Sequence, residues 1–216
     1  MSVSNAGQPL FTDDAAVVQS KTCQVESWVS AAHDASAYWL LPACNFTGNV
    51  ELTAGGARVH PDDGAGSGLI QLQAKTVVSP RREDRWAFGG VAGAIRDTGA
   101  APGGSAYQTY YAKAVTSVFP SEPLEIDLNI GAANTLHLGT FPILGAALQY
   151  AIGTRTALLA ETFRDSPGRG KYQVGARYSI VPARLDGFVS YGNRYGSPGE
   201  WSVVAGIRVN SAQFLP

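Results

Sequence analysis

Two carboxylates, Glu125 and Asp127, lie two residues apart in the run Leu124–Gly131 and therefore share one face of an extended chain. Carboxylates this close favour basic neighbours, because an unpaired charge in a narrow space with little water is costly. Four bases occupy the same parity of other alternating segments: Lys75, Lys113, Arg155 and Arg177. We expect a ladder of acid–base pairs in which Glu125 and Asp127 face at least one of these cations. The chemistry of such a ladder is ion pairing and ion selection.

The histidines do not support nucleophilic catalysis. In barrel enzymes that hydrolyse lipids, a His base and a Ser nucleophile lie two positions apart on one strand. The positions two residues after the three histidines hold other residues: Ala35 after His33, Asp62 after His60 and Gly139 after His137. We therefore predict no catalytic residues. The run Asp62–Gly64 is interpreted as a solvated turn, with weak calcium binding as the alternative, so no metal and no cofactor are predicted.

The two cysteines, Cys23 and Cys44, have neither the spacing nor the histidine neighbours of a zinc site. If a hairpin turns between His33 and Asp34, the two cysteines are directly opposed on neighbouring strands. A cross-strand disulfide is then geometrically plausible and fits an oxidising periplasm. We favour this disulfide over the alternative of two free, buried thiols. Its expected role is structural.

The chain that carries these residues alternates with a period of two, which is the side-chain period of a β-strand. Turn signals divide it into similar pieces. We predict twelve strands, at residues 23–32, 37–45, 49–59, 68–79, 85–96, 105–118, 124–133, 143–153, 155–164, 171–181, 184–192 and 200–210. Short turns alternate with longer connections such as 132–142 and 193–199. This is the layout of an antiparallel, up-and-down transmembrane β-barrel, with strands of the length that spans a bilayer.

The charge content indicates which face of the strands is exposed to water. Charged residues make up 15% of the chain, against about 25% in an average soluble domain, and the net charge is -1. These values exclude a nucleic-acid binder and favour polar side chains that line a lumen. The predicted lumen-lining residues are Glu26, Glu51, Gln71, Gln73, Lys75, Lys113, Glu125, Asp127, Asn129, Arg155, Glu161, Gln173, Arg177, Asp186 and Arg208. A soluble β-sandwich or barrel is the alternative.

The opposite parity is apolar and faces lipid in this interpretation. It carries residues such as Val29, Leu52, Leu128 and Val174. Aromatic residues gather toward the strand ends, as in the girdles of a spanning barrel: Tyr38, Trp86, Phe88, Tyr107, Tyr172, Tyr191 and Trp201. Their alternative role is to fill a soluble core. No apolar run approaches the 18 residues of a transmembrane helix.

The segment Pro9–Ala15, with its Thr12-Asp13-Asp14 run, precedes a strand that contains Gln24-Val25-Glu26. This start resembles that of bacterial outer-membrane proteins of the phenol-degradation meta-pathway transporter type. The resemblance implies a twelve-stranded outer-membrane barrel and passage of hydrophobic compounds. Asp13 and Asp14 are interpreted as turn residues, with contact to the periplasmic rim or cation binding as alternatives. Residues 1–22 form a periplasmic or lumen-associated segment, and residues 23–216 form the barrel.

The expected protein is a porin-like, passive channel or transporter for small molecules in the outer membrane of a Gram-negative bacterium, after removal of a signal peptide. Its partners are outer-membrane lipid and a small solute, without nucleic acid; whether a protein partner exists stays open. One alternative is a structural or partner-binding barrel with a closed lumen, since six acids and five bases of the predicted set can neutralise one another. Another is a surface enzyme.

Overall fold

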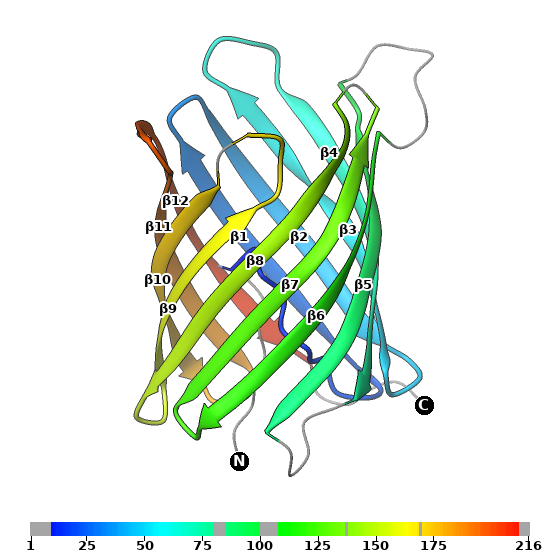
Figure 1. Ribbon diagram of the computed structural model, residues 1–216, viewed down its shortest axis with the longest axis vertical. Helices are drawn as coiled ribbons and strands as arrows, with labels where there is room; N and C mark the ends of the chain where they lie inside the picture. Colours follow the sequence, from blue (N-terminus) through cyan, green and yellow to red (C-terminus); the bar gives the residue numbers. More distant parts are fainter. Residues whose placement is uncertain (1–9, 80–84, 100–107, 137, 169, 212–216) are drawn as a thin grey trace.

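The structure, a computed structural model, describes residues 10–79, 85–99, 108–136, 138–168 and 170–211. Twelve antiparallel strands close into a single barrel in chain order, and β1 pairs with β12 to complete it (Figure 1). The strands are β1 (Thr22–Ala32), β2 (Ala35–Asn45), β3 (Val50–Pro61), β4 (Ser67–Ser79), β5 (Trp86–Asp97), β6 (Thr109–Ser121), β7 (Leu124–Thr135), β8 (Gly139–Ile152), β9 (Thr156–Arg164), β10 (Lys171–Val181), β11 (Leu185–Arg194) and β12 (Ser197–Asn210). The predicted fold class and strand number are confirmed.

Two connections differ from the sequence prediction. The expected loop 132–142 is mostly strand: β7 continues to Thr135, β8 begins at Gly139, and Pro142 lies opposite Ala132 in the ladder. The Leu138 N–H donates to the Thr135 carbonyl at 3.1 Å and closes a tight turn. Likewise, β11 and β12 leave a short turn where a loop over 193–199 was expected. Gly139 and Gly196 adopt φ values of 70° and 71°, so these glycines make the turns tight rather than long.

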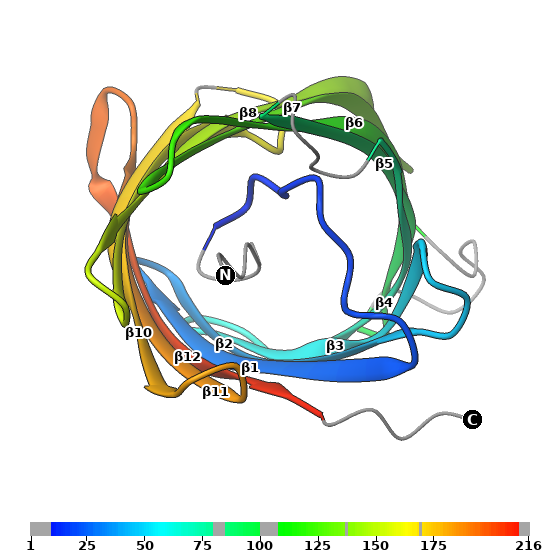
Figure 2. The ribbon, with the colours of Figure 1, turned by 90° about the horizontal axis from the view of Figure 1, so that it is seen from below.

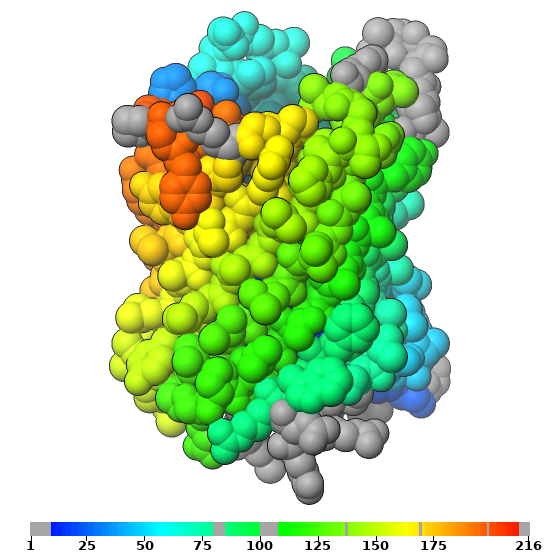
Figure 3. Space-filling model, in the orientation of Figure 1, coloured from blue at the N-terminus to red at the C-terminus, as the bar shows by residue number. Residues whose placement is uncertain are grey.

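The two ends of the barrel differ in their connections. The long-loop end, at the top of Figure 1, carries the connection 62–66 and the strand ends Asp97, Thr109, Arg164 and Lys171. The short-turn end, at the bottom, carries 46–49, 122–123, 153–155 and 182–184. The strand ladders close the wall all round, and the side drawn in Figure 3 is a continuous surface. A passage through the molecule would therefore follow the barrel axis.

The outer face is apolar, as the alternation predicts. Val29, Leu128 and Val174 are each at least 46% exposed. Exposed aromatic side chains form two groups: Tyr38, Tyr110, Tyr172, Tyr191 and Trp201 toward the long-loop end, and Trp86, Phe88, Tyr150 and Tyr178 toward the short-turn end. Tyr107 lies outside the described residues. Within the described part of the chain, no helix is long and apolar enough to cross a membrane.

The predicted disulfide is confirmed. Cys23 and Cys44 are direct partners in the β1–β2 ladder and are bonded, with Cα atoms 4.1 Å apart. They share the parity of the exposed Val25, so the bond lies on the outer face near the short-turn end. It joins the hairpin that closes the barrel against β12.

Candidate functional site: the lumen and its N-terminal segment

Residues 10–21, here called the N-terminal segment, cross the inside of the barrel before the chain enters β1 (Figure 2). Lys21, at a φ of 62°, ends the segment, and its N–H donates to the Asn45 carbonyl at 2.8 Å. The segment buries apolar side chains against the inner wall: Leu10 packs with Leu159 of β9, and Ala15 packs with Val115 of β6. These contacts make up much of the barrel's apolar core.

Wall carboxylates satisfy the backbone donors of the N-terminal segment. Glu161 of β9 accepts the N–H groups of Phe11 and Thr12, each at 2.9 Å, and also accepts a hydrogen bond from Gln173. Glu51 of β3 accepts the Val18 N–H at 2.8 Å. An irregular segment has no ladder to satisfy its N–H groups, so buried donors need such partners. Hydrogen bonds to a carboxylate are about twice as strong as neutral ones.

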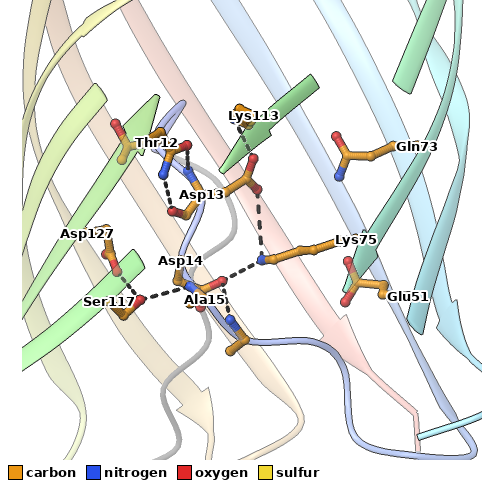
Figure 4. A network of polar contacts seen from close by, with 12 residues as sticks. Thr12, Asp13, Asp14, Ala15, Glu51, Gln73, Lys75, Lys113, Ser117 and Asp127 are labelled. Atoms are coloured by element: carbon orange, nitrogen blue, oxygen red, sulfur yellow. Dashed lines mark hydrogen bonds and ion pairs between the residues drawn. The ribbon is translucent and has the colours of Figure 1, made fainter. Parts of the chain in front are cut away.

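Two neutral side chains also hold the segment. Asn129 of β7 pairs with Asp13 in both directions: its Oδ1 accepts the Asp13 N–H at 2.9 Å, and its Nδ2 donates to the Asp13 carbonyl at 2.7 Å. Ser117 of β6 accepts the Ala15 N–H at 2.8 Å and donates to Asp127 at 2.5 Å (Figure 4). The Asn129 amide thus bonds to both backbone groups of Asp13, as a neighbouring strand would, and the Ser117 hydroxyl links the segment to the buried carboxylate of Asp127.

Three ion pairs, made by two lysines, join the side chains of the segment to the wall. Lys113 Nζ lies 2.5 Å from Asp13 Oδ2, and Lys75 Nζ lies 2.6 Å from Asp14 Oδ1 and 3.9 Å from Asp13 (Figure 4). Burial alone would raise the pKa of Asp13, but the charges of Lys113 and Lys75 outweigh it and hold this pKa below its ordinary value of 3.8. Asp13 therefore stays ionised and bound to both lysines at neutral pH.

A second set of charges gathers where β1, β12 and β11 adjoin. Arg208 of β12 lies between Glu26 and Asp186 in the two ladders that flank it, and its Nη2 is 2.6 Å from Asp186 Oδ2. Arg177 of β10 is half-buried and lies within the electrostatic reach of Asp186 and Glu125. These residues form a cross-strand network on the wall, and Arg177 also lies within the electrostatic reach of Asp14 in the segment.

The predicted acid–base ladder is wrong in part. Lys75 and Lys113 pair with the aspartates of the segment, whereas Asp127 is held by Ser117 and by Gln149, whose Nε2 donates to it at 2.9 Å. Arg155 does not belong to the wall: it is exposed in the turn between β8 and β9. The predicted strand begins at residue 155, whereas β9 begins at Thr156, so the parity argument failed at a turn boundary.

The remaining predicted side chains have these places. Gln71 and Gln73 of β4 bond to Tyr111, with Gln71 Nε2 donating to the Tyr111 hydroxyl at 3.2 Å and that hydroxyl donating to Gln73 Oε1 at 2.8 Å. Gln173 of β10 bridges Glu161 and Ser190. Glu125 is half-buried on β7. Among the predicted residues that lie on strands, six acids therefore accompany four bases.

Sequence reasoning missed the part that Asp13 and Asp14 play. Their local sequence predicts a turn, but the structure shows them bound to lysines more than 60 residues away in the chain. It also missed the aromatic residues of the inner wall. Trp28 of β1 and Trp39 of β2 have the inward parity of Glu26 and Leu41, a signal that was available in the alternation.

Above the N-terminal segment lies a cavity of about 560 Å³, here called the cup. Its floor is formed by Leu10–Asp13, and its upper lining includes Leu69, Ile95 and Leu138 at the long-loop end. Six aromatic residues line it: Phe11, Trp28, Trp39, Tyr111, Phe141 and Phe163. The cup is therefore lined by aromatic side chains together with polar and charged ones, which include Glu26, Glu51, Gln71 and Gln73.

The sequence matches the model of one protein family, described as uncharacterised conserved protein UCP029691, over residues 2–210. The chain belongs to this family. No curated protein matches it in sequence. Among solved structures, the KdgM porin has a TM-score of 0.70 at 10% identity and matches 86% of this chain and 98% of the porin. The NanC porin has a TM-score of 0.61 at 10% identity, over 89% of this chain and 100% of the porin.

Outer membrane phospholipase A from Escherichia coli shares the fold more distantly, with a TM-score of 0.53 at 13% identity, over 95% of this chain and 100% of the enzyme. At such identities the three structures establish the outer-membrane barrel fold. His33 and His60 are exposed near the long-loop end, and His137 lies outside the described residues. Within the described ranges, no group of three or more His, Cys, Asp or Glu side chains is arranged to hold a metal ion.

Proposed function

We propose that this protein is an outer-membrane channel for small solutes and that its N-terminal segment closes the channel at the short-turn half of the lumen. The observation that carries this proposal is the seat of residues 10–21: they cross the lumen of a closed barrel and are held by hydrogen bonds, ion pairs and packing alone. Such contacts can break without any change to the wall. The apolar outer face and its two aromatic groups fit a barrel surrounded by lipid.

The groups that hold the segment also form the path that its departure would open. Without Asp13 and Asp14, the lysines Lys75 and Lys113 face the bore together with Glu51 and Glu161. Small solutes would then pass a charged constriction whose mixed signs set selectivity. The resemblance of the chain's start to transporters of the phenol-degradation meta-pathway type supports hydrophobic compounds among these solutes. No catalytic role is proposed.

A reversible cross-link tests whether the segment closes the path. Ala15 of the segment contacts Ser117 of β6, with the Ala15 N–H 2.8 Å from the Ser117 hydroxyl. The double variant Ala15→Cys/Ser117→Cys can form a disulfide that fixes the segment to the wall. Purified full-length protein in liposomes is assayed for uptake of small neutral solutes, before and after mild reduction. The parent protein under both conditions controls for the native Cys23–Cys44 bond.

We expect the oxidised double variant to be impermeable and the reduced one to recover the uptake of the parent. Uptake that persists with the segment locked would place the path elsewhere and overturn the proposal. If the parent is silent, a variant without the segment's side-chain anchors, Asp13→Asn/Asp14→Asn, is assayed as well. A barrel that inserts correctly and stays silent in both forms has a closed lumen, and a structural or partner-binding role then replaces the channel.

A further inference from the structure

The cup has the size and lining of a binding site for a small molecule. Its volume of about 560 Å³ falls within the range of roughly 300–1,000 Å³ for ligand pockets, and six aromatic residues line it. A bore that carries only water and ions gains nothing from aromatic faces, because exposing them to water is unfavourable. We propose that the cup binds an uncharged solute with a flat aromatic ring and one polar group. This inference rests on the proposed function, since the cup lies on the path of the channel.

One aromatic platform is built into the wall. Trp28 and Trp39 are direct partners in the β1–β2 ladder, and their rings stack with centroids 5.4 Å apart and planes 7° apart. Phe188 and Val204 pack with Trp28 in one buried cluster, and Trp39 stacks on Trp28 and lies half-buried at the cup. A ring that enters the cup can continue this stack on Trp39.

A second platform belongs to the N-terminal segment. Phe11 stacks on Phe163 of β9, with centroids 4.5 Å apart and an interplanar angle of 18°. Although Glu161 holds its backbone N–H, the Phe11 side chain remains 46% exposed and lines the cup. A large apolar ring on the floor of a lumen is well suited to contact an apolar solute from below. The solute would thereby touch the segment that closes the channel.

The polar group of the solute has a partner in Tyr111 of β6. Its hydroxyl accepts from Gln71 and donates to Gln73, which fixes its orientation and leaves acceptor capacity on the oxygen. Gly93, its direct partner on β5, leaves room for this side chain: a Cβ at Gly93 would lie 2.4 Å from both Cζ and the hydroxyl oxygen of Tyr111. The wall is thus shaped to lay Tyr111 flat and present its hydroxyl at the cup.

The charges of the cup argue against an anionic solute. The two lysines of its lining, Lys75 and Lys113, are already paired with Asp14 and Asp13. Arg164 also lines the cup, at the rim where β9 ends, but the lining includes the carboxylates Glu26, Glu51 and Asp165 as well, so an anion meets no excess of positive charge. The KdgM porin was solved in complex with oligogalacturonate, an acidic saccharide, whereas this cup combines aromatic faces with neutralised lysines. An uncharged ring suits it better.

Benzamide is a suitable probe, because it carries one ring and one uncharged polar group. Its dissociation constant is measured by ligand-observed NMR titration of the full chain in nanodiscs. The comparison compounds are cyclohexanecarboxamide, which keeps the amide and lacks the aromatic face, benzoate, which adds a charge, and glucose, a neutral ring rich in hydroxyls. We expect saturable binding of benzamide, and binding at least tenfold weaker for each of the three others.

The variants are Trp39→Leu in the cup and Trp201→Leu on the outer face, which removes an indole from the lipid side as a matched control. Trp39→Leu should weaken benzamide binding about tenfold, the value of one aromatic contact, and Trp201→Leu should change it less than twofold. If Trp39→Leu fails to fold, Phe11→Ala and Tyr111→Phe take its place, with losses of at least threefold expected.

Equal losses from Trp39→Leu and Trp201→Leu would show partition into lipid and overturn the inference. Equal binding of cyclohexanecarboxamide or glucose would overturn the choice of an aromatic solute, and preferred binding of benzoate would overturn its neutral charge. Failure of the proposed function looks different. If the barrel binds benzamide saturably but stays impermeable with its segment free, the channel function is refuted and the binding site stands. If solutes are taken up without saturable binding, the binding site is refuted and the channel function stands.

Discussion

The carboxylate of Glu161 offers the sharpest perturbation of the closed lumen. Its Oε1 accepts from Phe11 and Gln173, and its Oε2 accepts the Thr12 N–H at 2.9 Å. In Glu161→Gln the amide oxygen can keep the first pair of bonds, so the new NH₂ group faces the Thr12 N–H, donor against donor. Thr12 is 2% exposed, and water cannot replace the lost acceptor while the segment is seated.

The expected cost follows from that geometry. A hydrogen bond to a charged group contributes about 1.5–3 kcal/mol, and a buried donor left without a partner costs about 1–3 kcal/mol. A loss of about 3 kcal/mol for the seated segment corresponds to roughly a hundredfold shift toward its release. In planar bilayers, the open probability of single channels should therefore rise by about two orders of magnitude from a low starting value.

The matched control is Asp186→Asn, which removes the same charge from the wall where the carboxylate pairs with Arg208 and does not touch the segment. It should leave the open probability within about twofold of the parent, although it can change ion preference. The reasoning is refuted if Glu161→Gln, correctly inserted, gates like the parent, or if both variants open the channel equally. The second result would mean that lumen charge, and not the hydrogen bonds, controls closure.

Three further outcomes follow from particular contacts. Gly145→Ala would place a Cβ 2.5 Å from the Thr12 hydroxyl and should raise solute uptake by liposomes, whereas Gly90→Ala, whose nearest neighbour would be 3.9 Å away, should behave like the parent. Lys75→Met removes the lysine that pairs with Asp14, which is 1% exposed, and should cost the seated segment about 3–5 kcal/mol. Limited proteolysis should then cut within residues 10–21, and a variant as resistant as the parent would contradict the pairing. Cys23→Ser/Cys44→Ser removes a disulfide between residues 21 positions apart, which contributes about 3 kcal/mol. The heat-modifiable gel shift should therefore occur at a lower temperature while conductance stays the same. A change in conductance would show that the outer face is coupled to the lumen.

The fold was largely predictable because its signals are local. The alternation in Leu124–Gly131 fixes the face of each residue of β7, since neighbouring side chains of a strand point to opposite sides. The His33–Asp34 turn then fixes the register that brings Cys23 opposite Cys44. The expected loop over 132–142 was wrong because Gly139 and Pro142 are typical loop residues. In the structure Gly139 completes a tight turn with a positive φ, and Pro142 is accommodated near the start of β8.

The site was less predictable, because its partners are distant in the chain. Nothing within residues 10–21 alternates or repeats, and their conformation is set by Glu161, Asn129, Ser117 and Glu51 on four different strands. Asp13 and Asp14 look like turn residues locally, since their lysines lie on β4 and β6. The prediction for Arg155 failed for a local reason: β9 begins one residue later than expected, at Thr156, which leaves Arg155 in the turn.

The order in which the chain can fold follows from the contacts of the N-terminal segment. Phe11 and Glu161 are separated by 150 residues, and Ala15 and Ser117 by 102. The first residues to be synthesised therefore cannot find their partners until β6, β7 and β9 stand in the wall. The barrel has to be built around an empty or water-filled lumen, and the segment enters it as a late folding step. The lumen of each newly folded barrel is therefore open at first, and the N-terminal segment can close it only after these strands are in place.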